Sequence, residues 1–192
     1  MKNRRGGSLR CNPGVFSVVS LAAPALTALA LTAAAAYAAA TLPAALQPPP
    51  GATGLSFKLA GDGVQRYQCK AKAGADGAFE WSLVEPRARL LDEARQEVGT
   101  HSAGPTWTAR DGSKVVRKRL VASVDSPSQG AIPWLLLEVD PSGGGMLGNV
   151  RYVQRLDTAG GKAPASGCDA GHAGATSDVP YTATYVFFTG KP

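Results

Sequence analysis

The sequence predicts an all-β domain, either a β-sandwich or a partly closed β-barrel with long loops. Short segments rich in Val, Tyr, Trp, Phe and Thr alternate between apolar and polar residues or are apolar throughout, as strands do. Gly, Pro and Asp separate these segments at short intervals, as turn residues do. The length of 192 residues allows one such domain and an extension.

The first expected strands alternate clearly. Gln65, Tyr67 and Cys69 share the side of residues 64–71 that we expect to face the core. Residues 79–83 place Phe, Trp and Leu on one side and follow a turn of sequence Gly-Ala-Asp-Gly. Both segments are therefore expected to be half-buried strands.

Three later segments extend the sheet. Residues 132–139 are apolar on both sides, which predicts a central strand with Pro133 confined to its start. Residues 179–189 are rich in aromatic rings and should dock as the last strand. Residues 86–96 carry apolar residues at helical spacing, but a strand fits equally well, so the sequence leaves this choice open.

Residues 149–158 place two polar side chains on opposite faces of one expected strand. Gln154 lies on an apolar face and should need a hydrogen-bond partner there. Arg155 lies on the other face. The neighbours of Gln154 on its face are Val150, Tyr152 and Leu156.

The N-terminal residues predict export to the periplasm or beyond. Residues 1–40 begin with basic residues, continue with an apolar run and end in small residues, as a cleavable secretory signal does. A retained membrane anchor is the alternative, because the run approaches the ~20 residues of a spanning helix. Residues 41–53 contain three consecutive prolines and are expected to form an extended leader before the β domain at 54–190.

Most of the excess positive charge lies in the expected signal. The chain has 20 basic and 14 acidic residues, and four basic but no acidic residues lie within 1–40. The remainder therefore has 16 basic and 14 acidic residues, a charge of +2. Because binding to phosphate backbones needs a persistent basic patch, we expect no nucleic-acid partner. Membrane contact is expected only through the signal before cleavage.

Two cysteines follow the expected signal. Cys69 and Cys168 are expected to form one disulfide, since paired thiols oxidise in exported proteins. A redox pair or a thiolate metal site is the alternative, but the chain has neither a Cys-x-x-Cys motif nor enough further ligands. We therefore predict no metal and no cofactor.

One short stretch gathers residues that could carry chemistry. His101, Trp107 and Asp111 lie around a Gly-Pro turn. His101 could act as a general base or ligand near neutral pH. Alternatively, His101 bonds a loop carbonyl, Trp107 packs and Asp111 begins a tight turn. Asp169 and His172 could assist His101 only if the fold brought them together.

A glycine-rich segment resembles a nucleotide-binding motif only formally. Residues 143–148 match Gly-x-Gly-x-x-Gly. A phosphate-binding loop needs a helix after it, and the residues that follow have a strand pattern. The segment is therefore expected to be a hairpin loop.

A series of uncommon sequence blocks occurs in order along the expected domain: 63–69, 99–107, 111–115, 132–137, 154–155, 158–164, 167–168 and 179–181. Together they resemble the exported bacterial and fungal family called domain of unknown function 3455. The resemblance spans residues 54–188, nearly the whole expected domain. It implies no activity, because the family has none that can be carried over.

These observations favour a non-catalytic binding or envelope-associated module, whose partner would be a small molecule or a component of the cell envelope. A hydrolase or metal-dependent enzyme centred on His101, with Asp111 as a second catalytic candidate, is the alternative. His101 in a cleft beside a carboxylate and a hydroxyl would favour the enzyme, and His101 buried against carbonyls would favour the binding module. The candidate ligand-binding residues are His101, Trp107, Asp111, Gln154 and Arg155.

Overall fold

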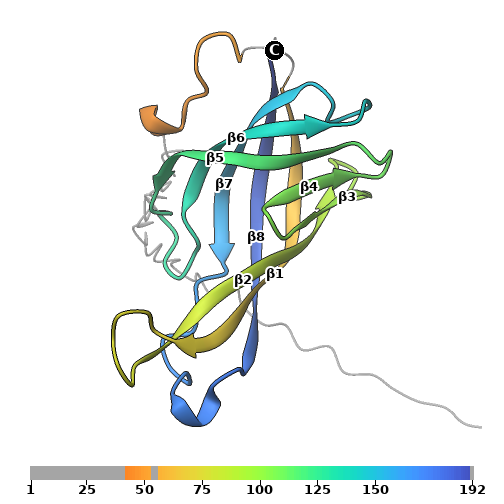
Figure 1. The fold of residues 1–192 in the computed structure, drawn as a ribbon. Coiled ribbons are helices and arrows are strands. Elements are labelled where there is room, and N and C mark those ends of the chain that lie inside the picture. The colour runs from red at the N-terminus through yellow and green to blue at the C-terminus, as the bar shows by residue number, and fades with distance from the viewer. Residues whose placement is uncertain (1–41, 53–55, 191–192) are drawn as a thin grey trace, which may run out of the picture. The chain divides into compact units, whose positions relative to one another are not determined.

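The computed structural model describes residues 42–52 and 56–190, which belong to one compact unit. The expected signal at 1–40 lies outside the described residues. Eight antiparallel strands form a closed barrel in which each strand pairs with the next in sequence and the last pairs with the first (Figure 1). The elements are η1 (Ala44–Leu46), β1 (Ser56–Ala71), β2 (Phe79–Leu91), β3 (Glu97–Ser102), β4 (Thr106–Ala109), β5 (Lys114–Val124), β6 (Trp134–Ser142), β7 (Val150–Gly160), η2 (Ala170–His172) and β8 (Thr176–Thr189).

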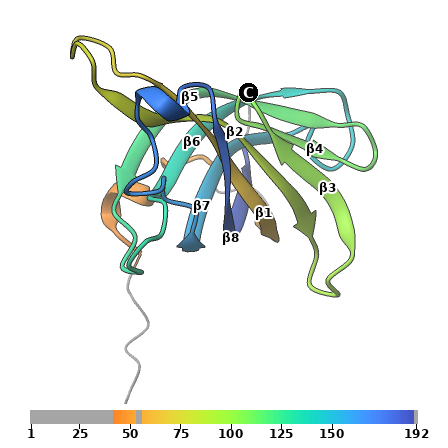
Figure 2. The same cartoon turned by 90° about the horizontal axis from the view of Figure 1, so that it is seen from below.

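Pairing of β1 with β8 closes the barrel. The pairing runs from Ser56 opposite Phe188 to Gln68 opposite Thr176, and Figure 2 shows the two strands side by side. The domain is therefore a β-barrel and not a β-sandwich, because pairing of the first strand with the last leaves no free sheet edge at this seam. No helix within residues 42–52 and 56–190 is both long and apolar enough to cross a membrane.

The segment that the sequence left open, 86–96, continues as a strand through the end of β2 and then turns. Pro86 pairs with Gln65 of β1, whereas β3 pairs with β2 only from Ala88 onward. The missing N–H of Pro86 therefore faces a side of β2 without a ladder partner, where proline is tolerated. Pairing of β2 with β1 therefore makes this segment a strand, a choice that the spacing of its apolar residues left open.

The barrel interior holds the main core. Gln65, Tyr67 and Cys69 all point inward on β1 and are 2, 7 and 1% exposed, which confirms the predicted buried face. The apolar cluster around them includes Leu59, Leu90, Trp107, Val115, Leu137, Val139, Val153, Tyr181, Tyr185 and Phe187.

A bulge changes one predicted face of β7. The register of β7 against β8 shifts between Val150 and Tyr152. Val150 therefore joins the interior cluster, whereas Tyr152 packs in a second cluster outside the barrel. The prediction that Val150 shares a face with Tyr152 is wrong, because strict alternation fails where a strand contains an extra residue.

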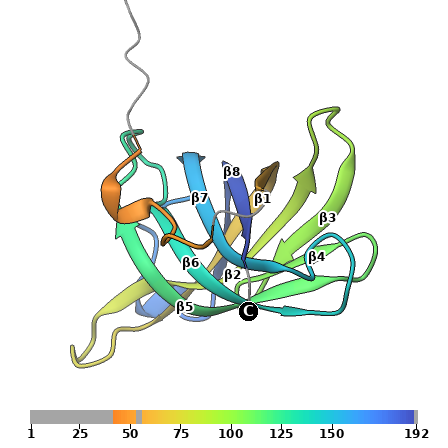
Figure 3. The same cartoon turned by 90° about the horizontal axis from the view of Figure 1, so that it is seen from above.

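The outer cluster is covered by the Pro-rich segment. Residues 42–52 run over the outside of β5 and β6 (Figure 3), and Leu46 is fully buried there against Trp134 and Leu136. The Gln154 Nε2 donates to the Leu46 carbonyl at 2.5 Å, so Gln154 has the partner that its apolar surroundings require. The segment is part of the folded unit.

Truncating Leu46 tests this docking. We expect Leu46→Ala to lower the free energy of unfolding by about 2–3 kcal/mol, since it removes a fully buried side chain and leaves a cavity. Urea denaturation measures the change. Gln47→Ala, at the exposed neighbouring position, is the matched control and should change stability by less than about 0.5 kcal/mol. Equal effects of both variants would show that the segment contributes no packing.

Candidate functional site

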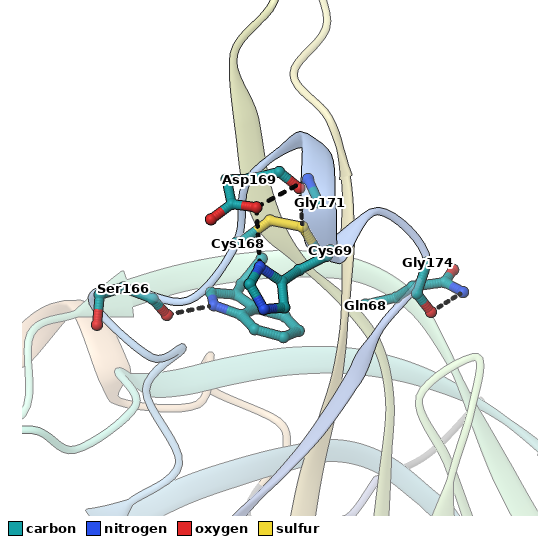
Figure 4. The surroundings of a disulfide bond; sticks show 9 residues. Gln68, Cys69, Ser166, Cys168, Asp169, Gly171 and Gly174 are labelled. Carbon is teal, nitrogen blue, oxygen red and sulfur yellow. Dashed lines mark hydrogen bonds and ion pairs between the residues drawn. A yellow bond between two sulfur atoms is a disulfide. The ribbon is translucent and has the colours of Figure 1, made fainter.

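A disulfide joins the end of β1 to the loop between β7 and β8. Cys69 and Cys168 are bonded, which confirms the predicted pair (Figure 4). The loop is held further by the Cys69 N–H, which donates to the Ala175 carbonyl at 2.8 Å, and by the Gly174 N–H, which donates to the Cys69 carbonyl at 2.9 Å. The Trp81 indole N–H donates to the Ser166 carbonyl at 2.9 Å. The loop is therefore anchored at several points.

Asp169 and His172 form hydrogen bonds within this loop. The His172 Nδ1 lies 2.8 Å from Asp169 Oδ1, and the Gly171 N–H donates to the same oxygen at 2.9 Å. Both side chains are exposed, and none of their described contacts reaches His101. Among the residues that the structure describes, no three His, Cys, Asp or Glu side chains are grouped as a metal site would need.

His101 and Trp107 are cross-strand partners inside the barrel. Their rings stack at a centroid distance of 4.3 Å with an interplanar angle of 12°. Tyr185 of β8 meets both rings edge-on, at 5.2 Å from His101 and 5.6 Å from Trp107. Gly61 leaves room for this arrangement, because a Cβ at that position would lie 2.5 Å from the Tyr185 ring.

The imidazole of His101 is neutral. Its Nδ1 lies 2.9 Å from the Thr106 carbonyl, so Nδ1 carries the proton and donates it, leaving Nε2 as an acceptor. Burial lowers the pKa of His101 to about 3, although the bond to Thr106 opposes that shift and the Arg155 charge adds to it. A groove of about 420 Å³ on β1, β2 and β3 includes His101 in its lining, but its carboxylate, Asp62, is bound to Arg89.

Arg155 lies on the inward face of β7, opposite Tyr185 of β8. Its Nε and Nη2 donate to the Pro133 carbonyl at 3.1 and 2.8 Å. Burial lowers the pKa of Arg155, while the neighbouring tyrosines, Tyr185 foremost, raise it. Arginine remains charged even so. Within the described residues, no carboxylate forms an ion pair with it.

Two tyrosine hydroxyls of β8 form the centre of this polar region. The hydroxyls of Tyr181 and Tyr185 are 3.1 Å apart and hydrogen-bonded. We call these two residues the tyrosine pair. Burial raises the pKa of both, so both keep their protons at neutral pH. Tyr67 lies on the same side, where its hydroxyl donates to the Gly161 carbonyl at 2.6 Å and burial likewise raises its pKa.

Asp111 belongs to a loop contact rather than to this interior. Its carboxylate accepts from the Ser113 N–H and hydroxyl at 2.9 and 2.5 Å and from the Met146 N–H at 2.8 Å. The pKa of Asp111 is lowered, mainly by the Ser113 hydroxyl. Asp111 thus ties the turn before β5 to the 143–148 loop, and that loop joins β6 to β7 as a hairpin.

Comparison with protein-family models gives a match that covers most of the chain. The model described as "Protein of unknown function (DUF3455)" matches residues 49–189. The chain belongs to this family. Comparison with curated proteins found no match, and neither did comparison with solved structures.

In this DUF3455 domain, the fold unites three of the five sequence-predicted site residues. His101, Trp107 and Arg155 meet around Tyr185, whereas Gln154 faces the outer cluster and Asp111 lies in the loop contact. The sequence reasoning missed the tyrosines as site residues. Their signal was available, because a buried tyrosine hydroxyl needs a polar partner, and several on inward faces predict a polar interior.

A second cleft lies outside the barrel. It measures about 550 Å³ and is bounded by the Pro-rich segment, β6 and β7. Arg151 and Lys118 line it together with Glu138 and Asp140. Lys118 is already bound to Glu138 at 2.9 Å, so this cleft carries mixed and partly paired charges.

Proposed function

We propose that the protein is an exported, non-catalytic binding module whose ligand site is the polar part of the barrel interior. The observation that carries the proposal is a set of donors without acceptors. Gln65 Nε2 and Trp107 Nε1 in the interior are buried and have no hydrogen-bond partner among the described residues, as is also true of Trp134 Nε1 in the outer cluster. Leaving a buried donor unpaired costs about 1–3 kcal/mol, so these groups favour a ligand that supplies acceptors.

The unpaired donors surround the tyrosine pair from different strands. Trp107 contacts Tyr185 directly. Gln65 lies near Tyr181, because a Cβ placed on Gly161 would touch both side chains. Arg155 of β7 lies opposite Tyr185 of β8. A ligand beside the tyrosine pair could therefore engage donors from three walls of the barrel, as ligand sites with a few convergent polar groups do.

The state of His101 supports binding over hydrolysis. A general base near neutral pH needs a pKa close to that pH and a group that orients it. The pKa of His101 is about 3, and its Nδ1 is engaged by a backbone carbonyl. The rings of Trp107 and Tyr185 pack against His101. The imidazole is therefore neutral, with Nε2 as a hydrogen-bond acceptor.

Export is supported by the signal-like N-terminus and by the disulfide, which is compatible with an oxidising compartment outside the cytoplasm. Either a small molecule or an envelope component could be the partner. A site in the barrel interior favours the small molecule, because only a ligand small enough to fit inside the barrel can occupy it.

The three tryptophans provide a built-in test. Each indole N–H gives a separate NMR signal, with Trp107 in the interior, Trp134 in the outer cluster and Trp81 bonded to the disulfide loop. We expect ligands from a panel of small acids, amides and sugars to shift the Trp107 signal and leave Trp81 unchanged. Hits that move only Trp81 or Trp134, or a panel without any effect on Trp107, would contradict the proposal.

A further inference from the structure

We propose, independently of the interior site, that the cleft outside the barrel binds an α-amino acid as its zwitterion, with Arg151 holding the carboxylate and Asp140 the ammonium group. The cleft measures about 550 Å³, which is within the range of small-molecule sites. Asp140 and Arg151 both line it and lie at the same end of the neighbouring strands β6 and β7, within two residues of the paired positions 138 and 152.

The Pro-rich segment gives the cleft a fixed wall. Leu46 is fully buried, and its carbonyl accepts from Gln154. Farther along, Ala52 is 4% exposed, and its N–H donates to the Pro49 carbonyl at 3.0 Å. The segment runs over the outside of the barrel (Figure 3), so a ligand in the cleft would lie between two folded parts of the chain.

Arg151 is the cation that can receive the ligand carboxylate. Its Nη1 donates to the neighbouring Val150 carbonyl at 3.1 Å, and no carboxylate among the described residues pairs with it. Arginine carries five N–H groups in a planar fork, so further donors remain for a carboxylate. Arg151 is half-buried, and water screens an ion pair less there than on an open surface.

Asp140 is the carboxylate that can receive the ligand ammonium group. Glu138, the other acid of the lining, already pairs with Lys118 at 2.9 Å and with Arg119 at 2.6 Å. The hydrogen bond to Glu138 is the main reason that the pKa of Lys118 is raised, and the charge of Asp140 contributes less. The Asp140 carboxylate forms no hydrogen bond or ion pair with another described residue, so it can bind a ligand cation.

The charge balance of the lining favours a zwitterion over a simple ion. The lining holds two cations and two carboxylates: Lys118, Arg151, Glu138 and Asp140. An anion alone would be attracted by Arg151 and repelled by Asp140, and a cation alone would meet the reverse. An α-amino acid carries both charges close together, so it can neutralise both groups at once.

The rest of the lining favours an apolar side chain on the ligand. Pro49, Pro50 and Ala52 line one wall, and Tyr152, which packs in the outer cluster, lines the other. Proline and tyrosine rings offer apolar surfaces against which an aromatic ring can pack. Free phenylalanine, which has both charges and an aromatic ring, is therefore the probe.

Titration calorimetry of the full chain with phenylalanine and two relatives tests the ligand class. N-acetylphenylalanine lacks the ammonium charge, and phenylalaninamide lacks the carboxylate charge. We expect phenylalanine to bind with a dissociation constant in roughly the millimolar range or below, and each relative to bind about fivefold more weakly. Equal or tighter binding of either relative would overturn the zwitterion class, and no binding of any of the three would overturn the site.

Two variants assign the charges. Arg151→Met should weaken the binding of phenylalanine and N-acetylphenylalanine about fivefold but not that of phenylalaninamide. Asp140→Asn should weaken the binding of phenylalanine and phenylalaninamide but not that of N-acetylphenylalanine. Arg117→Met and Asp125→Asn are the matched controls, because both positions are exposed and outside the lining. Equal losses in the variants and their controls would overturn the assignment, and thermal unfolding shows that each variant is folded.

NMR separates this site from the interior site. Phenylalanine in the cleft should shift the backbone amide signals of Gly51 and Arg151 and leave the Trp107 indole signal unchanged, because Trp107 lies inside the barrel. A shift confined to Trp107 would overturn the cleft site and support the interior one. Failure of phenylalanine to bind the cleft leaves the interior site standing, since that site depends on other residues.

Discussion

Replacing Cys69 and Cys168 together by serine is expected to lower the free energy of unfolding by about 4–5 kcal/mol. The two cysteines are 99 residues apart, so the disulfide closes a long loop and removes much conformational freedom from the unfolded chain. In the folded state, the loop between β7 and β8 keeps its backbone bonds to Cys69 and its bond from Trp81. We therefore expect the folded structure to persist while its stability falls.

Urea denaturation of the double variant and of the oxidised wild type, followed by tryptophan fluorescence, measures this loss. The reduced wild type should unfold at nearly the same urea concentration as the double variant, because both lack the same covalent link. A difference between oxidised and reduced protein below about 1 kcal/mol would show that the link contributes little to stability.

Acid is expected to destabilise the barrel through His101. The pKa of His101 is about 3 in the folded protein and near its usual value of 6.5 when unfolded. Between these two values the unfolded chain binds a proton that the folded chain does not, so stability falls as pH decreases. His101 alone should remove about 4 kcal/mol between pH 7 and pH 3, with a slope approaching about 1.4 kcal/mol per pH unit.

Comparison of two histidine variants isolates this contribution. Carboxylates such as Asp178 and Glu138 also have lowered pKa values, and they add their own acid sensitivity to every variant. His101→Gln should lose the part due to His101, whereas His172→Gln, at an exposed position, should keep it. Parallel curves of unfolding free energy against pH for the two variants would show that His101 is not buried in its neutral form.

The local pattern of the sequence predicts the strands well but not their closure. Alternation on β1 predicts that Tyr67 faces the core, and the two cysteines that follow the expected signal predict their own pairing. Closure depends on contacts between β1 and β8, which lie more than 100 residues apart in the chain and leave no local trace. Residues 86–96 show the same limit, since the pairing of β2 with β1 and with β3 excludes a helix there.

The candidate site was predictable where reactive residues cluster in sequence. His101 and Trp107 were found because they lie close together in the chain, and they do stack. Asp111 was found for the same reason, but its carboxylate locks a loop. Tyr185 was missed because a tyrosine on an aromatic strand has the same pattern as any core residue, and its role depends on Arg155 of the neighbouring strand.

Indole N–H NMR spectra of the protein titrated with small acids, amides and sugars would test the central claim most directly, because each tryptophan reports a different part of the molecule. We expect at least one ligand to shift the Trp107 signal and to leave the Trp81 signal unchanged. Ligands that move only the Trp81 or Trp134 signal would contradict an interior binding site.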